Sequence, residues 1–546
     1  MSALPLISPR QVHEQLRQGG ELALIDLREE DPHAEGHPLW AAQLSAGRLE
    51  LEASWRLPRL DVPIVLMDSG GAAGEGLVGP AARRLQALGY TAVSALEGGL
   101  QGWREAGLEV FIDVNAPSKS FGELLAETCA TPMLPALDVK ALIEAGADRV
   151  ILDVRRPDEF AAMRIPGGIN LPGGELGLGA GALAPDPSTR IIVHCAGRTR
   201  GILGSQGLIN LGLANPVAAL RNGTIGWTLA GLALEQEPPP RSSPAATAGR
   251  PQPDIQRAAA VLAARAGARP LDAAGLAAWR AETHRTLYCW DVRPAEDYAA
   301  GHRHGFGHAP GGQLVQEMDV YASVRGARIV LADGGPSIDG VRAPMAAHWL
   351  AQMGWEVAWM VDEPDAELES GPWRPSGARC APGPELHPEE LASGLGDGSV
   401  VLLDLQSGRD FERAHIAGAH WVLRSQAPLW WPQLRAGLSA SVRQLVCSCG
   451  DGRLAAWAAA ELRALSDLPV AVLAGGQAAW QAAGLALVAG TERMLSPRID
   501  RYRRPYEGTD VSREAMQAYL DWEYGLVAQL HRDGSHHFRV LQADGP

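Results

Sequence analysis

Residues 190–204 read Arg-Ile-Ile-Val-His-Cys-Ala-Gly-Arg-Thr-Arg-Gly-Ile-Leu-Gly. The β-branched run that ends at His194 predicts a buried strand, and the small residues after it predict a tight loop leading into a helix. Cys195 would then lie where loop N–H groups and the positive end of the helix meet. Amide donors and the cations Arg198 and Arg200 stabilise a thiolate and hold an anion beside it. This stretch therefore predicts a nucleophilic cysteine next to an anion-binding loop.

The same pattern occurs four times along the chain. Each repeat begins with a short apolar run that is followed by an aspartate. A second apolar run comes later, and the first residue after it is the loop residue. The paired aspartates and loop residues are Asp26 and Asp68, Asp153 and Cys195, Asp291 and Asp333, and Asp404 and Cys449. The two members of a pair are 42 residues apart in the first three repeats and 45 in the fourth. We therefore expect four units of similar fold.

Short apolar strands alternate with helical stretches in each unit, which predicts an α/β fold with a small parallel sheet flanked by helices. The expected units are 1–114, 131–235, 257–376 and 383–490. A Pro-, Ser- and Ala-rich stretch predicts a linker over 236–256. The extension 491–546 carries Met516, Tyr519, Trp522 and Leu526 at helical spacing, so we expect a helix that docks on the units.

The loops sort the units into two kinds. Units 2 and 4 have cysteine at the loop position, followed 13 residues later by a leucine of the next helix. Units 1 and 3 have aspartate and a glycine-rich loop, and the matching leucine follows after 17 residues. The pattern is typical of two tandem pairs, each with one cysteine-bearing member.

Four motifs around Cys195 occur in a distinctive order. The first motif is Leu152-Asp-Val-Arg155, and the second is the turn Arg164-Ile-Pro-Gly-Gly168. The third is the cysteine loop, and the fourth, which closes the unit, is Asn222-Gly-Thr-Ile-Gly-Trp227. This order resembles the rhodanese (sulfurtransferase) family, with Arg164 where the family prefers His and Asn222 where it has Gly. The resemblance covers about residues 1–490.

The resemblance implies a sulfurtransferase that carries sulfur as a persulfide on Cys195. Thiosulfate is the favoured donor because two cations suit a compact dianion, and a thiol or cyanide is the acceptor. The loop residues expected to bind the donor are Gly197, Arg198, Thr199 and Arg200. Asp153 and Arg155 are expected to support the loop from beneath. Units 1 and 3 should be silent because aspartate forms no persulfide, and no metal or cofactor is expected.

Cys449 is the possible second nucleophile. Its loop has one cation, and Asp451 adds a negative charge that disfavours a thiolate. Cys447 and Arg453 have the spacing of cysteine phosphatases, but the register with unit 2 places Cys447 inside the strand. Three alternatives therefore stay open beside the main hypothesis: a persulfide-carrying or non-catalytic scaffold, a mercaptopyruvate sulfurtransferase and a rhodanese-like phosphatase.

Composition narrows the class of partner. A net charge of −15 argues against nucleic acid. The sequence has no apolar run long enough for a membrane span and no signal peptide, and six scattered cysteines do not make a disulfide framework. We therefore expect a cytoplasmic protein that acts on a small sulfur donor and a thiol acceptor, with no membrane or nucleic-acid partner.

Overall fold

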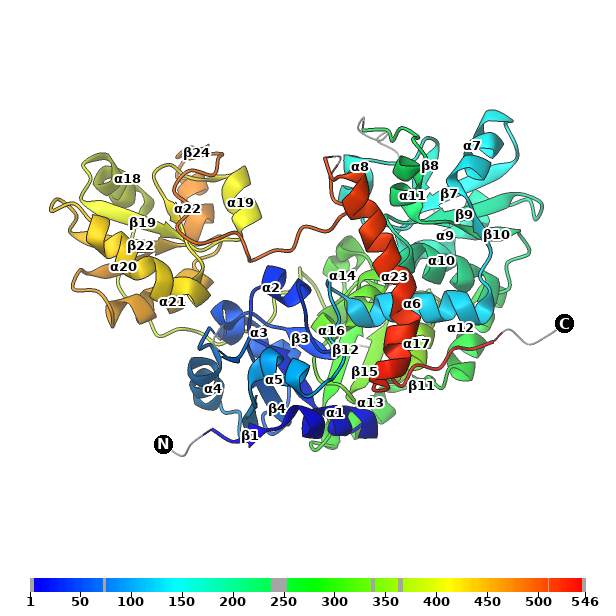
Figure 1. Ribbon diagram of the computed structural model, residues 1–546, viewed down its shortest axis with the longest axis horizontal. Coiled ribbons are helices and arrows are strands. Elements are labelled where there is room, and N and C mark those ends of the chain that lie inside the picture. Colours follow the sequence, from blue (N-terminus) through cyan, green and yellow to red (C-terminus); the bar gives the residue numbers. More distant parts are fainter. Residues whose placement is uncertain are drawn as a thin grey trace.

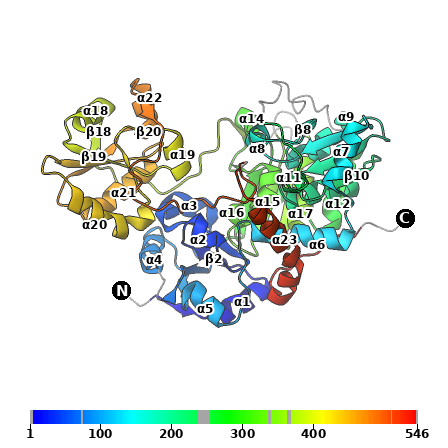
Figure 2. The same cartoon turned by 45° about the horizontal axis from the view of Figure 1, so that its top comes forward.

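Four five-stranded parallel sheets organise the chain (Figures 1 and 2). The computed structural model describes residues 4–71, 75–236, 253–334, 339–361, 367–508 and 510–542. When the five strands of each of these sheets are numbered along the chain, their order across the sheet is 1-5-4-2-3 in all four. The predicted α/β units and their helical C-terminal segment are confirmed.

Each unit contributes one sheet, whose strands follow in spatial order. Unit 1 has β1 (Leu6–Ile7), β5 (Val93–Leu96), β4 (Ile64–Met67), β2 (Ala23–Asp26) and β3 (Ala41–Gln43). Unit 2 has β6 (Met133–Leu134), β10 (Val217–Leu220), β9 (Arg190–His194), β7 (Arg149–Asp153) and β8 (Gly168–Asn170). Unit 3 has β11 (Arg269–Leu271), β16 (Glu356–Met360), β15 (Arg328–Ala332), β12 (Leu287–Asp291) and β14 (Gly307–His308). Unit 4 has β18 (Glu385–Leu386), β23 (Val470–Leu473), β22 (Gln444–Ser448), β19 (Val400–Asp404) and β21 (His420–Trp421). Two antiparallel pairs are added, β13 (His302–Arg303) with β17 (Leu368–Glu369) and β20 (His415–Ile416) with β24 (Leu487–Val488).

Helices connect the strands and flank each sheet. Those of units 1 and 2 are α1 (Pro9–Gln18), α2 (Glu30–Ala34), α3 (Leu49–Arg56), α4 (Val78–Ala87), α5 (Gly99–Glu105), α7 (Ala136–Glu144), α8 (Pro157–Ala162), α9 (Leu176–Leu183), α10 (Thr199–Asn210) and α11 (Gly223–Leu229). Those of units 3 and 4 are α12 (Pro253–Arg265), α13 (Ala273–Ala281), α14 (Ala295–Ala300), α15 (Gly311–Gln316), α16 (Met318–Tyr321), α17 (Arg342–Gln352), α18 (Pro388–Gly396), α19 (Gly408–Arg413), α20 (Ala427–Gly437), α21 (Arg453–Arg463) and α22 (Gly476–Ala482). Short 3-10 turns are η1 (Ala46–Arg48), η3 (Gly173–Glu175) and η5 (Arg424–Gln426). None of the helices in the described part of the chain combines the length and apolar character needed to cross a bilayer.

Two helices lie outside the repeated pattern and pack against each other: α6 (Ala116–Cys129), between units 1 and 2, and α23 (Arg513–Asp533), in the C-terminal extension. Figure 1 shows α23 in red crossing α6 beside unit 2. Phe121 and Leu125 of α6 are fully buried, so this connection is part of the core. The predicted docking of a C-terminal helix is confirmed.

Each aspartate-bearing unit faces a cysteine-bearing unit that is not its neighbour in the same tandem pair. Unit 1 meets unit 4 where η1 contacts η5, and unit 2 meets unit 3 where η3 contacts α15. Gly174 and Gly312 approach so closely that a Cβ on Gly174 would lie 3.1 Å from the backbone nitrogen of Gly312. Units 1 and 3 share one hydrophobic core, where the Tyr288 hydroxyl donates a hydrogen bond to the Arg56 carbonyl at 2.6 Å.

One end of the linker differs from the expectation. The linker is expected to run to residue 256, but α12 begins at Pro253, so residues 253–256 form the first turn of that helix. Residues 237–252 of the linker lie outside the described residues. Unit 3 ends differently from the other three units. Units 1, 2 and 4 have a helix after the last strand of the sheet, whereas described residues 361 and 367–376 of unit 3 contain none.

Candidate active site

Cys195 lies immediately after β9, and α10 begins four residues later. Because β7 and β9 run parallel, Asp153 at the end of β7 is the register partner of His194. The cysteine thus lies at the carboxyl edge of the sheet, where loops of parallel α/β folds form binding sites. Its side chain is buried.

Asp153 and Arg155 form a buried ion pair beneath this loop. The Arg155 Nε donates to Asp153 Oδ1 at 2.9 Å, and its Nη2 donates to the Met163 carbonyl at 2.6 Å. The same pair recurs as Asp26 with Arg28 in unit 1 and as Asp291 with Arg293 in unit 3. Because both of those units have aspartate in place of the cysteine, the pair is a shared feature of the three units and is not specific to the cysteine loop.

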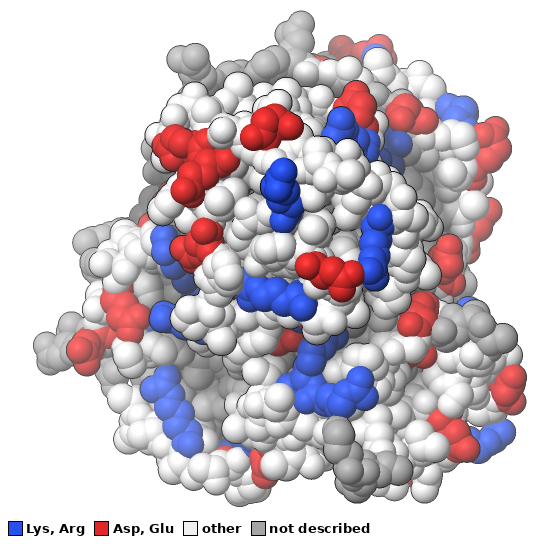
Figure 3. All heavy atoms as spheres, turned by 90° about the vertical axis from the view of Figure 1, so that its left-hand side faces the viewer, with Lys and Arg blue, Asp and Glu red and all other residues white. Residues whose placement is uncertain are grey.

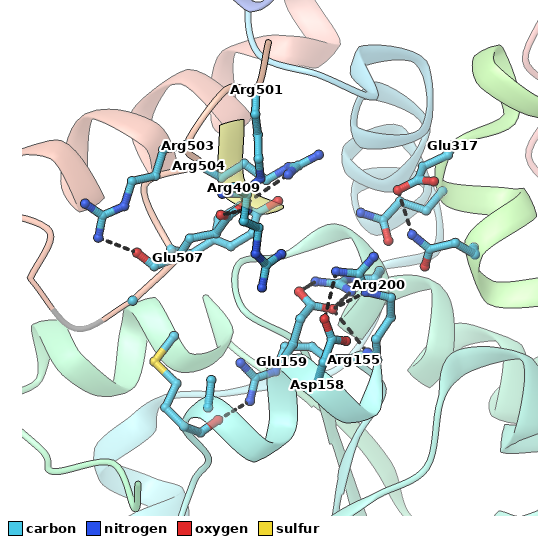
Figure 4. Close-up of a pocket in the computed structure, with 17 residues that line it drawn as sticks. Arg155, Asp158, Glu159, Arg200, Glu317, Arg409, Arg501, Arg503, Arg504 and Glu507 are labelled. Carbon is cyan, nitrogen blue, oxygen red and sulfur yellow. Dashed lines mark hydrogen bonds and ion pairs between the residues drawn. The ribbon is translucent and has the colours of Figure 1, made fainter. Parts of the chain in front are cut away.

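The Cys195 thiol is influenced by burial and by Arg200. Burial raises the pKa of the thiol, and the nearby Glu523 and Asp153 carboxylates add to the rise; the Arg200 charge and a hydrogen bond from the Gly201 N–H oppose it without cancelling it. The Arg200 guanidinium binds both oxygens of Glu159, at 2.7 and 2.9 Å (Figure 4). Burial alone would raise the pKa of Glu159, but Arg200 lowers it to about 2. Arg200 therefore keeps a full charge beside the sulfur.

Arg198 is bound through its guanidinium by side chains that lie outside the cysteine loop. Its Nε and Nη2 each donate to a Glu123 oxygen at 2.7 Å, and its Nη1 donates to Asn222 Oδ1 and to the Tyr524 hydroxyl. Its guanidinium also lies 4.1 Å from the centre of the Tyr524 ring. In this conformation Arg198 ties the loop to α6 and α23. No local sequence signal could reveal this, because Tyr524 is 326 residues away along the chain.

The other predicted loop residues lie beneath the same two helices. A Cβ on Gly197 would lie 3.2 Å from the Tyr519 ring and 3.4 Å from the Glu523 carboxylate, so only glycine fits without movement. The Thr199 hydroxyl is buried and has no hydrogen-bond partner in the described structure. Residues 195–199 are all buried. Of the predicted donor-binding side chains, that of Arg200 lines the two cavities described next.

Arg200 lines two cavities beside the loop. One, of about 310 Å³, is rich in arginine and is bounded by α8, α15, α19 and residues 501–508. The other, of about 420 Å³, is mostly apolar and lies between units 2 and 3, where Arg342 binds Glu175 at 2.6 Å. We call the first the basic cavity. Sequence reasoning named Arg155 and Arg200 but missed the other arginines of this cavity, because the seven come from four separate parts of the chain.

Cys449 lies immediately after β22, and Cys447 is inside that strand as predicted. Burial raises the pKa of Cys449, but hydrogen bonds from the N–H groups of Ala455, Leu454 and Gly452 oppose this. The Ala455 nitrogen is 3.4 Å from the sulfur. The Asp451 carboxylate, 3.8 Å away, raises the pKa further.

Unit 1 faces the loop of Cys449. Arg48 at the end of η1 is close enough for its charge to interact with that of a Cys449 thiolate. A cavity of about 270 Å³ lies between the two units; its charged lining residues are two arginines, Arg48 and Arg424, and four carboxylates, those of Glu29, Glu30, Glu52 and Asp500. This environment is less favourable to an anionic donor than that of Cys195.

In units 1 and 3 a carboxylate accepts hydrogen bonds at the loop position. Asp68 accepts from the N–H groups of Gly70 and Leu77, at 3.0 and 3.1 Å, and Asp333 accepts from Ala343 at 2.9 Å. Helix α4 begins ten residues after Asp68, compared with four residues between Cys195 and α10.

A family model described as "Rhodanese-like domain" matches residues 8–106, 136–230 and 387–483, just over half of the chain. A crystal structure of thiosulfate sulfurtransferase from Pseudomonas aeruginosa is 50% identical, covers 99% of this chain and 100% of that chain, and superposes with a TM-score of 0.91. A rhodanese-related protein from Thermoplasma volcanium is 19% identical and covers 19% of this chain and 98% of that chain, with a TM-score of 0.17. A search among curated proteins found no match.

Proposed function

The chain belongs to the rhodanese family, and we propose that it transfers sulfur from thiosulfate to a small-molecule acceptor through a persulfide on Cys195. The observation that carries the proposal is the 50% identity to a thiosulfate sulfurtransferase across nearly the whole of both chains. The chain is a sulfurtransferase, and the resemblance read from the motifs is confirmed.

In the first step the Cys195 thiolate attacks the outer sulfur of thiosulfate. A new S–S bond forms, the S–S bond of thiosulfate breaks, and sulfite leaves with the bonding electron pair. The Gly201 N–H and the Arg200 charge favour the thiolate, which supports Cys195 as the nucleophile. Arg200 also lines both neighbouring cavities, which supports it as the residue that attracts the dianion.

In the second step the thiolate of the acceptor, or cyanide, attacks the outer sulfur of the persulfide. The bond between the two sulfurs of the persulfide breaks, and Cys195 leaves as a thiolate ready for the next cycle. One sulfur atom moves in each step, with no net oxidation. Arg198 holds the loop in place through Glu123, which supports a positioning role for this arginine.

Cys449 is the second candidate carrier, because three backbone N–H groups point at its sulfur. Such donors stabilise a developing negative charge in acyl-transfer enzymes, and they would stabilise a persulfide in the same way. The carboxylates in the neighbouring cavity argue against thiosulfate as its direct donor. We therefore keep Cys195 as the residue that meets the donor.

Persulfide mapping tests the assignment. The full-length protein is incubated with thiosulfate, freed of excess reagent and digested, and each cysteine peptide is weighed. We expect the mass of one added sulfur on the Cys195 peptide, and we expect Cys195→Ser to abolish transfer while its melting temperature stays close to that of the parent. Sulfur on Cys449 alone, with most of the activity kept in Cys195→Ser, would move the assignment to Cys449. Absence of the adduct from both peptides would favour a non-catalytic scaffold.

A further inference from the structure

The basic cavity is built by parts of the chain that the repeated fold does not bring together. Figure 4 shows Arg409 of α19 and Arg501 and Arg504 of the C-terminal extension on one side, and Arg200 with Glu159 of unit 2 on the other. Seven arginines and four carboxylates line the cavity. Basic and acidic side chains are instead interspersed over the described part of the outer face in Figure 3.

On the side of the cavity formed by Arg409, Arg501 and Arg504, there are fewer carboxylates than arginines. Glu507 is shared by Arg501 and Arg504, and it accepts a hydrogen bond from Arg504 at 2.9 Å. Arg504 is also 3.8 Å from Glu30. Arg409 forms no ion pair or hydrogen bond with any described residue. Uncompensated guanidinium groups that share a cavity repel one another, so an anion placed between them would stabilise this arrangement.

The remaining carboxylates do not supply that anion. Asp158 is 3.2 Å from Arg156, and Glu159 is fully engaged with Arg200. Glu317 accepts a hydrogen bond from Gln313, and burial raises its pKa, which weakens its negative charge. The net charge of the cavity is therefore positive on the side of Arg409.

We propose that the basic cavity binds a small molecule with at least two oxyanion groups, held between Arg409 of unit 4 and Arg501 and Arg504 of the C-terminal extension. Guanidinium groups bind carboxylate and phosphate oxygens through two parallel hydrogen bonds, and every cation that lines this cavity is an arginine. Phosphate and carboxylate ligands share this chemistry, so both are tested.

The size of the cavity fits a molecule larger than thiosulfate. About 310 Å³ is room for roughly ten waters of ~30 Å³ each, whereas thiosulfate has only five non-hydrogen atoms. The volume lies at the lower end of the range of about 300–1,000 Å³ for small-molecule sites. This site goes beyond the proposed thiosulfate chemistry, and its occupant needs no sulfur.

Isothermal titration calorimetry on the full-length Cys195→Ser protein tests the site without turnover. Pyrophosphate, citrate and acetate are the probes, at two salt concentrations. We expect pyrophosphate, citrate or both to bind at least tenfold more tightly than acetate, and their affinity to fall as salt rises. Binding of only one of them would identify the oxyanion class that the site accepts.

Arg409→Gln should weaken that binding about tenfold, because one charge-assisted contact is lost. Arg413→Gln is the matched control, since it removes the same charge from the same helix but lies outside the cavity. Arg501→Gln provides a second variant from the other side. Failure of both polyanions to bind, equal affinity for acetate, or equal loss in Arg409→Gln and Arg413→Gln would overturn the proposal. None of these outcomes depends on whether Cys195 carries sulfur.

Discussion

Arg198 and Arg200 stand two residues apart, and the fold directs their charges to different partners. The side chain of Arg198 is 5% exposed and bound to Glu123, whereas that of Arg200 is 13% exposed and lines two cavities. A buried pair that loses one partner leaves an uncompensated charge, which is costly. Loss of a partly exposed cation beside a reacting sulfur should affect turnover instead.

Replacing each arginine by methionine separates the two roles. Arg200→Met should lower kcat/KM for thiosulfate about 10- to 100-fold, as expected for a charge-assisted hydrogen bond of ~1.5–3 kcal/mol. Arg198→Met should lower the free energy of unfolding by about 3–5 kcal/mol, since buried Glu123 loses its partner. Steady-state kinetics and chemical denaturation check both. Normal kinetics in Arg200→Met would remove this arginine from the donor site.

Glu523 makes the docking of α23 depend on pH. Burial raises the pKa of its carboxyl to about 8, even though Lys119 opposes the shift. A glutamate in the unfolded chain titrates near 4.3. Between these values the folded protein binds a proton that the unfolded chain lacks, so the free energy of unfolding falls as pH rises. The stabilisation is complete below about pH 4 and is lost as pH passes through about 8.

Glu523→Gln should remove this dependence because the amide stays neutral. We expect the melting temperature of the parent protein to fall more steeply between pH 5 and pH 8.5 than that of the variant. The maximal slope is about 1.4 kcal/mol per pH unit. Asp521→Asn, on an exposed position of the same helix, should keep the parent's pH dependence. Parallel curves for parent and Glu523→Gln would contradict the prediction.

At the scale of elements, helix α23 packs directly on the cysteine loop. Its residues Met516, Tyr519 and Leu520 pack with Ala196 of the cysteine loop and with Ile225. Helical spacing in the sequence predicts the helix and its docking, since an apolar stripe needs a partner surface. It cannot predict which loop the helix covers, because that depends on contacts between residues more than 300 positions apart.

Weakening this contact should expose Cys195. Leu520→Ala removes a fully buried side chain, at a cost of about 2–5 kcal/mol, and should loosen α23 before the units unfold. The rate of Cys195 alkylation by iodoacetamide, followed by peptide mass spectrometry, should then rise while that of Cys449 stays constant. Gln517→Ala, on the exposed face of the helix, should change neither rate. An unchanged Cys195 rate in Leu520→Ala would show that α23 does not limit access.

Units 1 and 3 are expected to be catalytically silent, and a cysteine placed in the loop of unit 1 tests whether loop shape or the aspartate itself prevents catalysis. Asp68 receives N–H groups from Gly70 and Leu77 rather than from a compact run of neighbours. Asp68→Cys should therefore give a thiol with a pKa near the ordinary value of about 8.5, and no transferase activity in a Cys195→Ser, Cys449→Ser background. Thiol titration and a transferase assay check this. Measurable turnover would mean that the aspartate alone keeps unit 1 silent.

At the scale of the whole molecule, the sequence predicts the number of units but not how they face one another. The recurring aspartates and loop spacings are local, so each unit can be read from its own residues. The contacts of unit 1 with unit 4 and of unit 2 with unit 3 depend on side chains such as Arg424 and Glu50, which are 374 residues apart. The same limit hid the basic cavity, which requires Arg409 of unit 4 to reach unit 2.

Arg424 fixes unit 4 on unit 1, and its loss should separate them. It binds Glu50 at 2.7 and 2.9 Å, Glu461 at 2.7 Å and the Gly47 carbonyl at 3.0 Å, and it is almost completely buried. Arg424→Met removes both short contacts of Glu50 and leaves it the longer contact to Arg84 at 3.5 Å. We expect a larger radius of gyration in small-angle X-ray scattering and a separate, earlier unfolding transition for unit 4.

The same variant connects this interface to the basic cavity. If unit 4 moves, Arg409 leaves the cavity, so polyanion binding should weaken at least as much as in Arg409→Gln. Persulfide formation on Cys195 should persist, because units 2 and 3 keep their own contact through η3 and α15. Arg435→Met, which removes an exposed pair with Asp467, is the control and should leave size, unfolding and binding unchanged. An unchanged radius of gyration together with parent-like polyanion affinity would show that other contacts hold unit 4 in place.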